Sequence, residues 1–187
     1  MTEHAVVLQG HLPLALGEWP NDAGTRNALM ADNLVLLRAL LVMDEHIVTN
    51  DEEGHEGLSN LETKVDLLLL LVSAGVKGLG PTPPSYPCIL GSEDLYWDCP
   101  DPVLFAGADN ETCIALFLRP RIAMPLLLPG SMQPLSGPSG GASGGGTRCH
   151  LHFHLDSRVQ ESLDRLIFRH HRRAVARSKD QHHPPDV

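Results

Sequence analysis

The sequence predicts an α+β protein: a small antiparallel β-barrel with a C-terminal helix, plus a long, coiled-coil-like helical insertion after an N-terminal strand. Three patterns indicate this class. Apolar residues recur at helical spacing through residues 33–75. Short apolar segments separated by Gly, Pro, Asp and Asn turns run from residue 87 to residue 156. An amphipathic stretch with a basic face then begins at Asp156 or Ser157.

The N-terminal segment, residues 1–24, is expected to join the barrel. Residues 4–16 mix β-branched and apolar side chains around Gly10 and Pro13, which is typical of a short, bent edge strand. A turn-rich linker follows it. Either Asp22 or Thr25 can cap a helix that begins near Asn27.

The helical region, residues 25–80, carries an apolar seam whose members recur mostly at steps of three and four residues. The seam consists of Leu36, Leu40, Met43, Ile47, Leu58, Leu61, Val65, Leu68 and Val72. From Ile47 to Leu58 is about three helical turns, a stutter-like spacing that favours one continuous helix. Gly54 and Gly57 favour a break into a hairpin, because each costs about 1 kcal/mol relative to Ala inside a helix. Both arrangements stay open.

This seam has more apolar surface than a small barrel needs. We therefore expect it to be buried between copies of the chain in a homo-oligomer. The mixture of Leu with Ile47 and Val65 is compatible with a dimer, a trimer or a tetramer.

The composition changes at Gly78, where GLGPTPPSYP is too rich in Gly and Pro for a helix or a central strand. Residues 81–179 are assigned to the barrel and its C-terminal helix, which is expected to end near Arg177. Within them, residues 136–146 (SGPSGGASGGG) are predicted to form a flexible hairpin loop. Residues 180–187 are predicted to be a disordered tail.

Composition narrows the function classes. The chain has 187 residues, 14 basic against 23 acidic, and the net charge of -9 disfavours a general nucleic-acid binder. The longest apolar run, Leu67 to Val72, is too short to span a bilayer, and the N-terminus has no secretory signal pattern. We expect a cytoplasmic protein without a membrane partner. Four widely spaced cysteines without a CxxC pair indicate reduced, buried thiols.

Three alternating histidines are the first candidates for a functional site, because imidazoles can bind a metal ion. His150, His152 and His154 alternate, so on a strand they share one face, with Leu151 and Phe153 on the other. Imidazoles about 7 Å apart cannot share one ion unless the strand bends or another residue joins them. The pattern favours a polar outer face over a metal site. Because no GxSxG, HExxH or paired-carboxylate motif is present, we predict no catalytic residue, no cofactor and no enzyme activity.

The C-terminal helix carries a row of arginines from Arg165 to Arg177. Guanidinium groups pair well with phosphate oxygens, so a phosphate-binding site is one interpretation. It would use Arg169, Arg172, Arg173 and Arg177. The row is not interleaved with aromatic residues, which favours a solvated face that pairs with the acidic helix or with a partner.

Two stretches together resemble a family. VQESLDRLIFRHHRR after the last strand, and the strand series from ILGSEDLYWDC to LLLPG, resemble a PilZ domain over residues 84–179. The preceding LETKVDLLLLLV resembles a subgroup of atypical PilZ proteins with added helices that support oligomerisation. PilZ domains that bind cyclic di-GMP use an RxxxR motif on the approach to the barrel and a (D/N)xSxxG motif in the next strand.

Both ligand motifs are lost here. The approach, VKGLGPTPPSYP, contains no arginine. At the second motif, one alignment places Ile89, Gly91 and Asp94 where the family has its Asp or Asn, its Ser and its Gly. The other alignment matches Ser92 to the motif serine and places Leu90 and Leu95 at the two outer positions. The ligand carries two phosphates that arginines clamp, so ordinary binding should be abolished.

The resemblance therefore implies a PilZ fold without the usual ligand site. It implies a non-enzymatic bacterial adaptor that associates with itself and with other signalling or pilus proteins, in surface motility, type IV pilus function or virulence regulation. The alternative is a receptor for cyclic di-GMP or a related nucleotide with a relocated arginine site.

Overall fold

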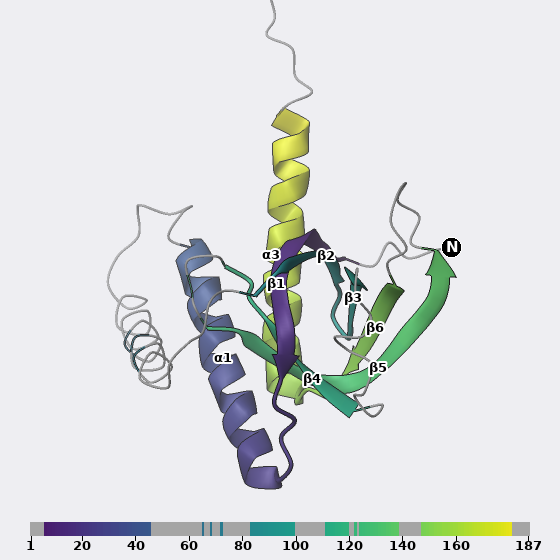
Figure 1. Ribbon diagram of the computed structural model, residues 1–187. Coiled ribbons are helices and arrows are strands. Elements are labelled where there is room, and N and C mark those ends of the chain that lie inside the picture. Colours follow the sequence, from purple (N-terminus) through teal and green to yellow (C-terminus); the bar gives the residue numbers. More distant parts are fainter. Residues whose placement is uncertain are drawn as a thin grey trace, which may run out of the picture.

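A computed structural model of the chain describes residues 6–45, 65, 68, 72, 83–99, 111–119, 122, 124–138 and 147–180. Within these residues, six antiparallel strands close into a barrel in the order β1-β2-β3-β6-β5-β4, and helices α1 and α3 run beside it (Figure 1). The predicted α+β class, a small barrel with a C-terminal helix, is confirmed. The long helical insertion after the first strand is supported in part, by α1.

The strands are β1 (Leu8–Gly17), β2 (Ser85–Leu90), β3 (Asp94–Cys99), β4 (Glu111–Leu116), β5 (Leu126–Pro138) and β6 (Thr147–Phe153). The helices are α1 (Ala23–Glu45) and α3 (Ser157–Asp180). Every second residue of β2 and β3 is buried, as the two-residue period of a strand requires. Strand β5 extends to Pro138, three residues into the predicted loop, and the rest of that loop lies outside the described residues.

The expectation that the N-terminal strand lies at an edge is wrong. The first half of β1, from Leu8 to Pro13, pairs with β2, and the second half, from Leu14 to Gly17, pairs with β4. Pro13 has no N–H to donate, and the strand changes partner at this residue. Because its two halves pair with different strands, β1 links β2 to β4 and closes the barrel.

Helix α1 begins at Ala23, four residues before the expected start, because Asp22 caps it. The Oδ1 atom of Asp22 accepts a hydrogen bond from the Thr25 backbone N–H at 2.9 Å, and its Oδ2 atom accepts one from the Thr25 hydroxyl at 2.6 Å. Asn33 fixes α1 to the barrel. Its side chain donates to the Leu127 carbonyl at 2.6 Å and accepts from the Leu127 N–H at 2.9 Å.

The predicted oligomer seam needs a correction at its beginning. Leu36 and Leu40 are only 1% and 2% exposed, and they pack in the hydrophobic core of the single chain. This face of α1 is turned inward, because α1 packs against α3 and β5. Met43, one turn later, is 45% exposed. The choice between one helix and a hairpin, like seam residues Ile47, Leu58 and Leu61, lies outside the described residues.

Helix α3 covers the barrel with the predicted apolar stripe. Asp156 caps the helix by accepting a hydrogen bond from the Val159 N–H at 2.8 Å. Val159, Leu163, Leu166 and Ile167 are buried, whereas Ala174, the last predicted member, is exposed. The helix continues to Asp180, three residues beyond the expected end.

The four cysteines, Cys88, Cys99, Cys113 and Cys149, are thiols buried in the barrel, as predicted. Among the described residues, no helix is long and apolar enough to cross a membrane.

Candidate functional site

The outer face of β3 and β6 carries the polar side chains that sequence analysis placed on one strand face. Leu151 and Phe153 of β6 are buried, while His150 is half-buried and His152 is exposed. The predicted polar outer face is therefore confirmed. His154 follows the end of β6, and its Nε2 atom lies 3.1 Å from the Ser131 hydroxyl of β5.

Asp94 of β3 joins two of these histidines. Its Oδ1 atom lies 2.7 Å from His150 Nε2 and 3.0 Å from His152 Nδ1. A carboxylate only accepts hydrogen bonds, so both ring nitrogens donate. Partial burial raises the pKa of Asp94, but the hydrogen bonds and charges of His150 and His152 outweigh it and hold this pKa below its ordinary value.

This cluster is a hydrogen-bonded network. In the part of the chain that the structure describes, no group of three or more His, Cys, Asp and Glu side chains is arranged to hold a metal ion. Asp94 accepts from two histidines and His154 bonds to Ser131, so these side chains are already engaged with one another.

Aromatic and cationic groups continue the network along the same strands. The ring of Tyr96 stacks on the ring of His150, with centroids 4.5 Å apart and planes 9° from parallel. The guanidinium carbon of Arg148 lies 5.7 Å from the Tyr96 ring centroid, within cation–π distance. The strand register accounts for these contacts, because Tyr96 of β3 lies opposite His150 of β6, and Asp98 of β3 lies opposite Arg148 of β6.

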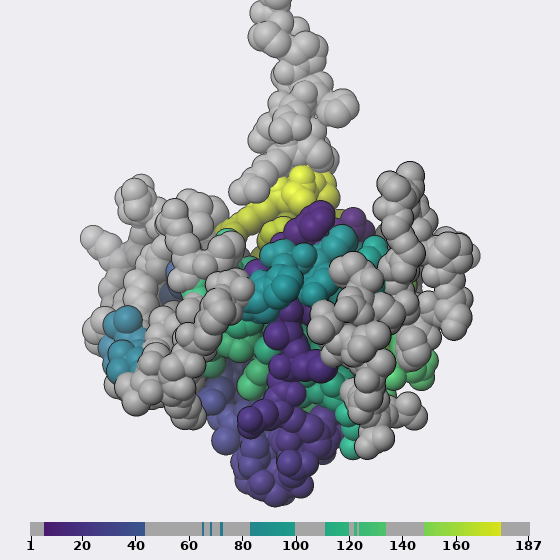
Figure 2. Space-filling model, in the orientation of Figure 1, coloured from purple at the N-terminus to yellow at the C-terminus, as the bar shows by residue number. Residues whose placement is uncertain are grey.

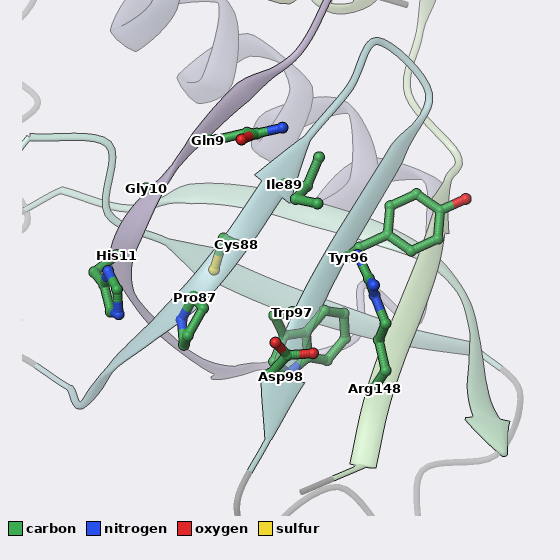
Figure 3. A pocket seen from close by; sticks show the side chains of 10 residues that line it. All are labelled: Gln9, Gly10, His11, Pro87, Cys88, Ile89, Tyr96, Trp97, Asp98 and Arg148. Carbon is green, nitrogen blue, oxygen red and sulfur yellow. The ribbon is translucent and has the colours of Figure 1, made fainter. Parts of the chain in front are cut away.

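A shallow pocket of about 230 Å³ opens beside this stack. Its lining comes from four strands: β1, β2, β3 and β6. Figure 2 shows β1 and β2 side by side on this surface, and Figure 3 shows Arg148 lying next to Tyr96 at one side of the pocket. The lining residues are Gln9, Gly10, His11, Pro87, Cys88, Ile89, Tyr96, Trp97, Asp98 and Arg148. The pocket therefore places one guanidinium and one carboxylate beside aromatic and apolar surface that a planar group can stack on.

The positions aligned with the lost ligand motif do not form a polar site. Leu90 and Leu95 are fully buried inside the barrel. Ile89 contributes an apolar side chain to the pocket, and Asp94 is engaged by the two histidines. Gly91 forms the hairpin turn between β2 and β3, where its N–H donates to the Asp94 carbonyl at 2.8 Å.

The arginines predicted as an alternative phosphate site lie on α3 and have separate neighbours. Arg169 donates to the Leu41 carbonyl of α1 at 3.2 Å, so it joins the two helices. Arg172 is exposed, with its guanidinium carbon 6.0 Å from the centroid of the Phe168 ring. Arg173 is half-buried, and the side chain of Arg177 lies outside the described residues.

Sequence reasoning missed Asp94, Tyr96 and Arg148 as partners of the histidines. The sequence does show the two-residue spacing of these side chains, because Asp94, Tyr96 and Asp98 alternate on β3 just as the histidines do on β6. The missing information was the pairing, because more than forty residues separate these two neighbouring strands in the chain.

Both the sequence and the fold of this chain are similar to PilZ domains. A sequence model of the family described as "Atypical PilZ domain, cyclic di-GMP receptor" matches residues 37–180. A solved structure of a pathogenic protein from Xanthomonas campestris, described as a tetrameric PilZ domain self-assembled via an unusual helical bundle, is similar with a TM-score of 0.62. The identity is 20%, over 92% of this chain and 91% of that chain, so this likeness shows the fold. No curated protein matches the sequence.

Proposed function

The chain belongs to the family of atypical PilZ domains described as cyclic di-GMP receptors, and on this basis we propose that it is a non-enzymatic cytoplasmic adaptor that self-associates through exposed helical residues. Its further partners would be other signalling or pilus proteins, in bacterial surface motility, type IV pilus function or virulence regulation. The observation that carries the proposal is the exposed stripe formed by Val65, Leu68 and Val72.

The three residues of the exposed stripe have the sequence spacing of one helix face. They are helical and spaced at i, i+3 and i+7, and they are 44%, 60% and 64% exposed. Fully burying a Val or Leu side chain contributes about 1.5–3 kcal/mol, which a second copy of the chain would supply. The tetrameric assembly described for the similar Xanthomonas protein supports self-association of this fold.

We also propose that the adaptor does not bind cyclic di-GMP at the usual motif. Leu90 and Leu95 are buried, and Ile89 offers no hydrogen bond. Two phosphates need charge-assisted donors, and the sequence before β2 has no arginine at the motif position.

Light scattering tests the self-association. We expect the intact chain to be a multimer and the Leu68→Ser/Val72→Ser variant to be a smaller species. Leu16→Ser is the matched control, because Leu16 is 45% exposed on β1, outside the exposed stripe. A monomeric intact chain, or a double variant as large as the wild type, would contradict the proposal.

A second candidate is a nucleotide receptor, favoured by the pocket beside Tyr96 and Arg148. Calorimetric titration with cyclic di-GMP distinguishes the nucleotide-receptor candidate from the adaptor proposal. The adaptor proposal expects no binding at micromolar concentrations. Micromolar binding that is lost in Arg148→Ala but kept in Arg172→Ala/Arg173→Ala would establish the barrel pocket as the receptor site. The reverse pattern would instead establish an arginine site on α3.

A further inference from the structure

Helix α3 has apolar side chains on a side that does not face the core. Phe168 is 52% exposed, and Val175, two turns later on the same side of the helix, is 39% exposed. The buried residues Leu163 and Ile167 lie on a different side, against the barrel. Figure 1 shows the C-terminal part of α3 extending past the strands. This part of the helix therefore offers apolar surface to another molecule.

Charged residues are placed symmetrically about Phe168. Asp164 lies one turn before it and Arg172 one turn after it, and both side chains are exposed. The guanidinium carbon of Arg172 lies 6.0 Å from the centroid of the Phe168 ring. We call this side of the helix, with Asp164, Phe168, His171, Arg172 and Val175, the solvent face of α3. It has an acidic end, an apolar centre and a basic end.

Two other arginines near this face are engaged within the chain. Arg165 donates to the Glu161 carboxylate at 2.6 Å, one turn away on the same helix, so these two charges compensate each other. Arg169 donates to the Leu41 carbonyl of α1 at 3.2 Å. The acidic end and the basic end therefore set the charge pattern of the solvent face.

A hollow lies at the basic end of the solvent face. It has a volume of about 360 Å³ and is lined by His171, Arg172, Val175 and Ala176. An imidazole and a guanidinium beside small apolar groups suit a carboxylate. If two copies of α3 lie antiparallel and cross near Phe168, the Asp164 side chain of each copy comes to the hollow of the other. The solvent face is thus complementary to itself in charge and in shape.

We propose that the solvent face of α3 packs antiparallel on the same face of a second copy of this chain. Phe168 packs on its counterpart near a two-fold axis, and each Arg172 meets the Asp164 of the other copy. The contact is isologous, because both copies use the same surface. It uses none of the residues of the exposed stripe. It is therefore a second contact, beyond the proposed self-association through the stripe, and the two contacts together can link more than two copies.

Cross-linking of two cysteine variants tests the antiparallel geometry. Asp164→Cys and Arg172→Cys are made in the full-length chain, mixed in equal amounts and treated with a short bifunctional maleimide. The mixture should form cross-linked dimers, because position 164 of one copy lies beside position 172 of the other. Each variant alone should form at least about tenfold fewer, since equal positions lie about 12 Å apart along an antiparallel pair.

The wild type is the blank in this experiment, because its four cysteines are buried in the barrel. If each variant formed cross-linked dimers by itself as readily as the mixture does, the helices would pack parallel and the proposal would be wrong. Absence of cross-linked dimers from the mixture would overturn it as well.

Charge exchange tests the same contact by sedimentation equilibrium. Asp164→Arg and Arg172→Asp should each weaken association about tenfold, because each places like charges together. The double variant Asp164→Arg/Arg172→Asp should associate like the wild type, since its face is again complementary to itself. Arg38→Asp, at an exposed position of α1, is the control and should also associate like the wild type. Circular dichroism checks that every variant is folded.

Failure of this inference can be told apart from failure of the proposed function. In the Leu68→Ser/Val72→Ser background, the α3 contact should leave a dimer that Asp164→Arg converts to a monomer. A monomer before Asp164→Arg is added would overturn the α3 contact and leave association through the stripe standing. A background variant as large as the wild type, made smaller by Asp164→Arg, would support the α3 contact and contradict the stripe.

A different occupant of the solvent face would also be detected. If the charge variants left sedimentation unchanged but Arg172→Asp abolished binding of the full chain to phosphatidylglycerol vesicles, the face would be a lipid-binding one and the proposal would be wrong.

Discussion

One buried polar residue, Asn33, holds helix α1 to the barrel. Asn33 is 1% exposed, and its amide forms a pair of hydrogen bonds with the backbone of Leu127. Strand β6 pairs with β5 from Gly130 onward, so the side chain of Asn33 occupies the place beside Leu127 that a neighbouring strand would take. Replacing Asn33 would leave a backbone donor and acceptor without these partners in the protein interior.

We therefore expect Asn33→Ala to lower the free energy of unfolding by about 2–4 kcal/mol. Urea unfolding followed by circular dichroism measures the change. Arg38→Ala, at an exposed position of the same helix, is the control and should change stability by less than about 0.5 kcal/mol. Equal stability of the Asn33 variant and the control would show that the amide pair does not hold α1 in place.

Asp94 links stability to pH. Its pKa is held below the ordinary value, so the carboxylate stabilises the folded state above the unfolded pKa of about 3.9. This contribution is lost as pH falls through the lower, folded-state pKa. Asp94→Asn removes the titrating group but keeps an oxygen that accepts a hydrogen bond.

Wild type should therefore be more stable than Asp94→Asn at pH 6, and the difference should shrink as pH falls from about 5 to about 2. Urea midpoints measured across this range test the expectation. Asp98→Asn is the control on the same strand face, because it leaves both histidine contacts of Asp94 in place. A constant difference between wild type and Asp94→Asn would rule out the linkage.

At the scale of the elements, Gly130 of β5 lies close against the backbone of β6. A Cβ atom at Gly130 would collide with the carbonyl oxygen of His152, and it would also lie 2.9 Å from the His152 carbonyl carbon and 3.1 Å from the Leu151 side chain. The carbonyl belongs to the backbone of the neighbouring strand, so it cannot rotate away as a side chain would. Only glycine lets the two strands approach this closely.

Gly130→Ala should thus destabilise the fold by about 3 kcal/mol or more, because β5 and β6 must move apart. Thermal unfolding and soluble yield would report the loss. Gly10→Ala on β1 is the matched control, since a Cβ atom there meets no atom within 4 Å. A Gly130→Ala protein that unfolds at the temperature of the Gly10→Ala protein would show that the strands can separate at little cost.

At the scale of the whole molecule, the closed barrel isolates its thiols from solvent. Burial raises the pKa of Cys88, Cys113 and Cys149 to about 11. At pH 8 only on the order of one thiol in a thousand is then ionised at each of these sites. Reaction with a thiol reagent requires the barrel to open.

We expect all four cysteines to react at once with a chromogenic disulfide reagent in urea, and slowly in the folded protein. The slow rate should follow global stability, so it should rise in Gly130→Ala and not in Gly10→Ala. Reaction of any thiol within seconds in the native protein would mean that the barrel opens locally.

Local patterns in the sequence were sufficient for much of this fold. Alternating side chains predict β2, β3 and the two faces of β6, and helical spacing with a cap at Asp156 predicts α3. These features depend on residues a few positions apart, so the chain encodes them directly. Family membership could be inferred in the same way, from the order of the elements.

Tertiary structure decided which surfaces meet. Helical periodicity treats Leu36, Leu40 and Leu68 alike, but packing against α3 and β5 buries the first two and leaves Leu68 60% exposed. The candidate site likewise depends on β3 lying beside β6, which brings Asp94 and Tyr96 to the histidines. Periodicity determines which side of an element is apolar, whereas the pairing of distant elements depends on the free energy of the whole packed chain. The closed barrel therefore decides where the polar face of β3 and β6 lies.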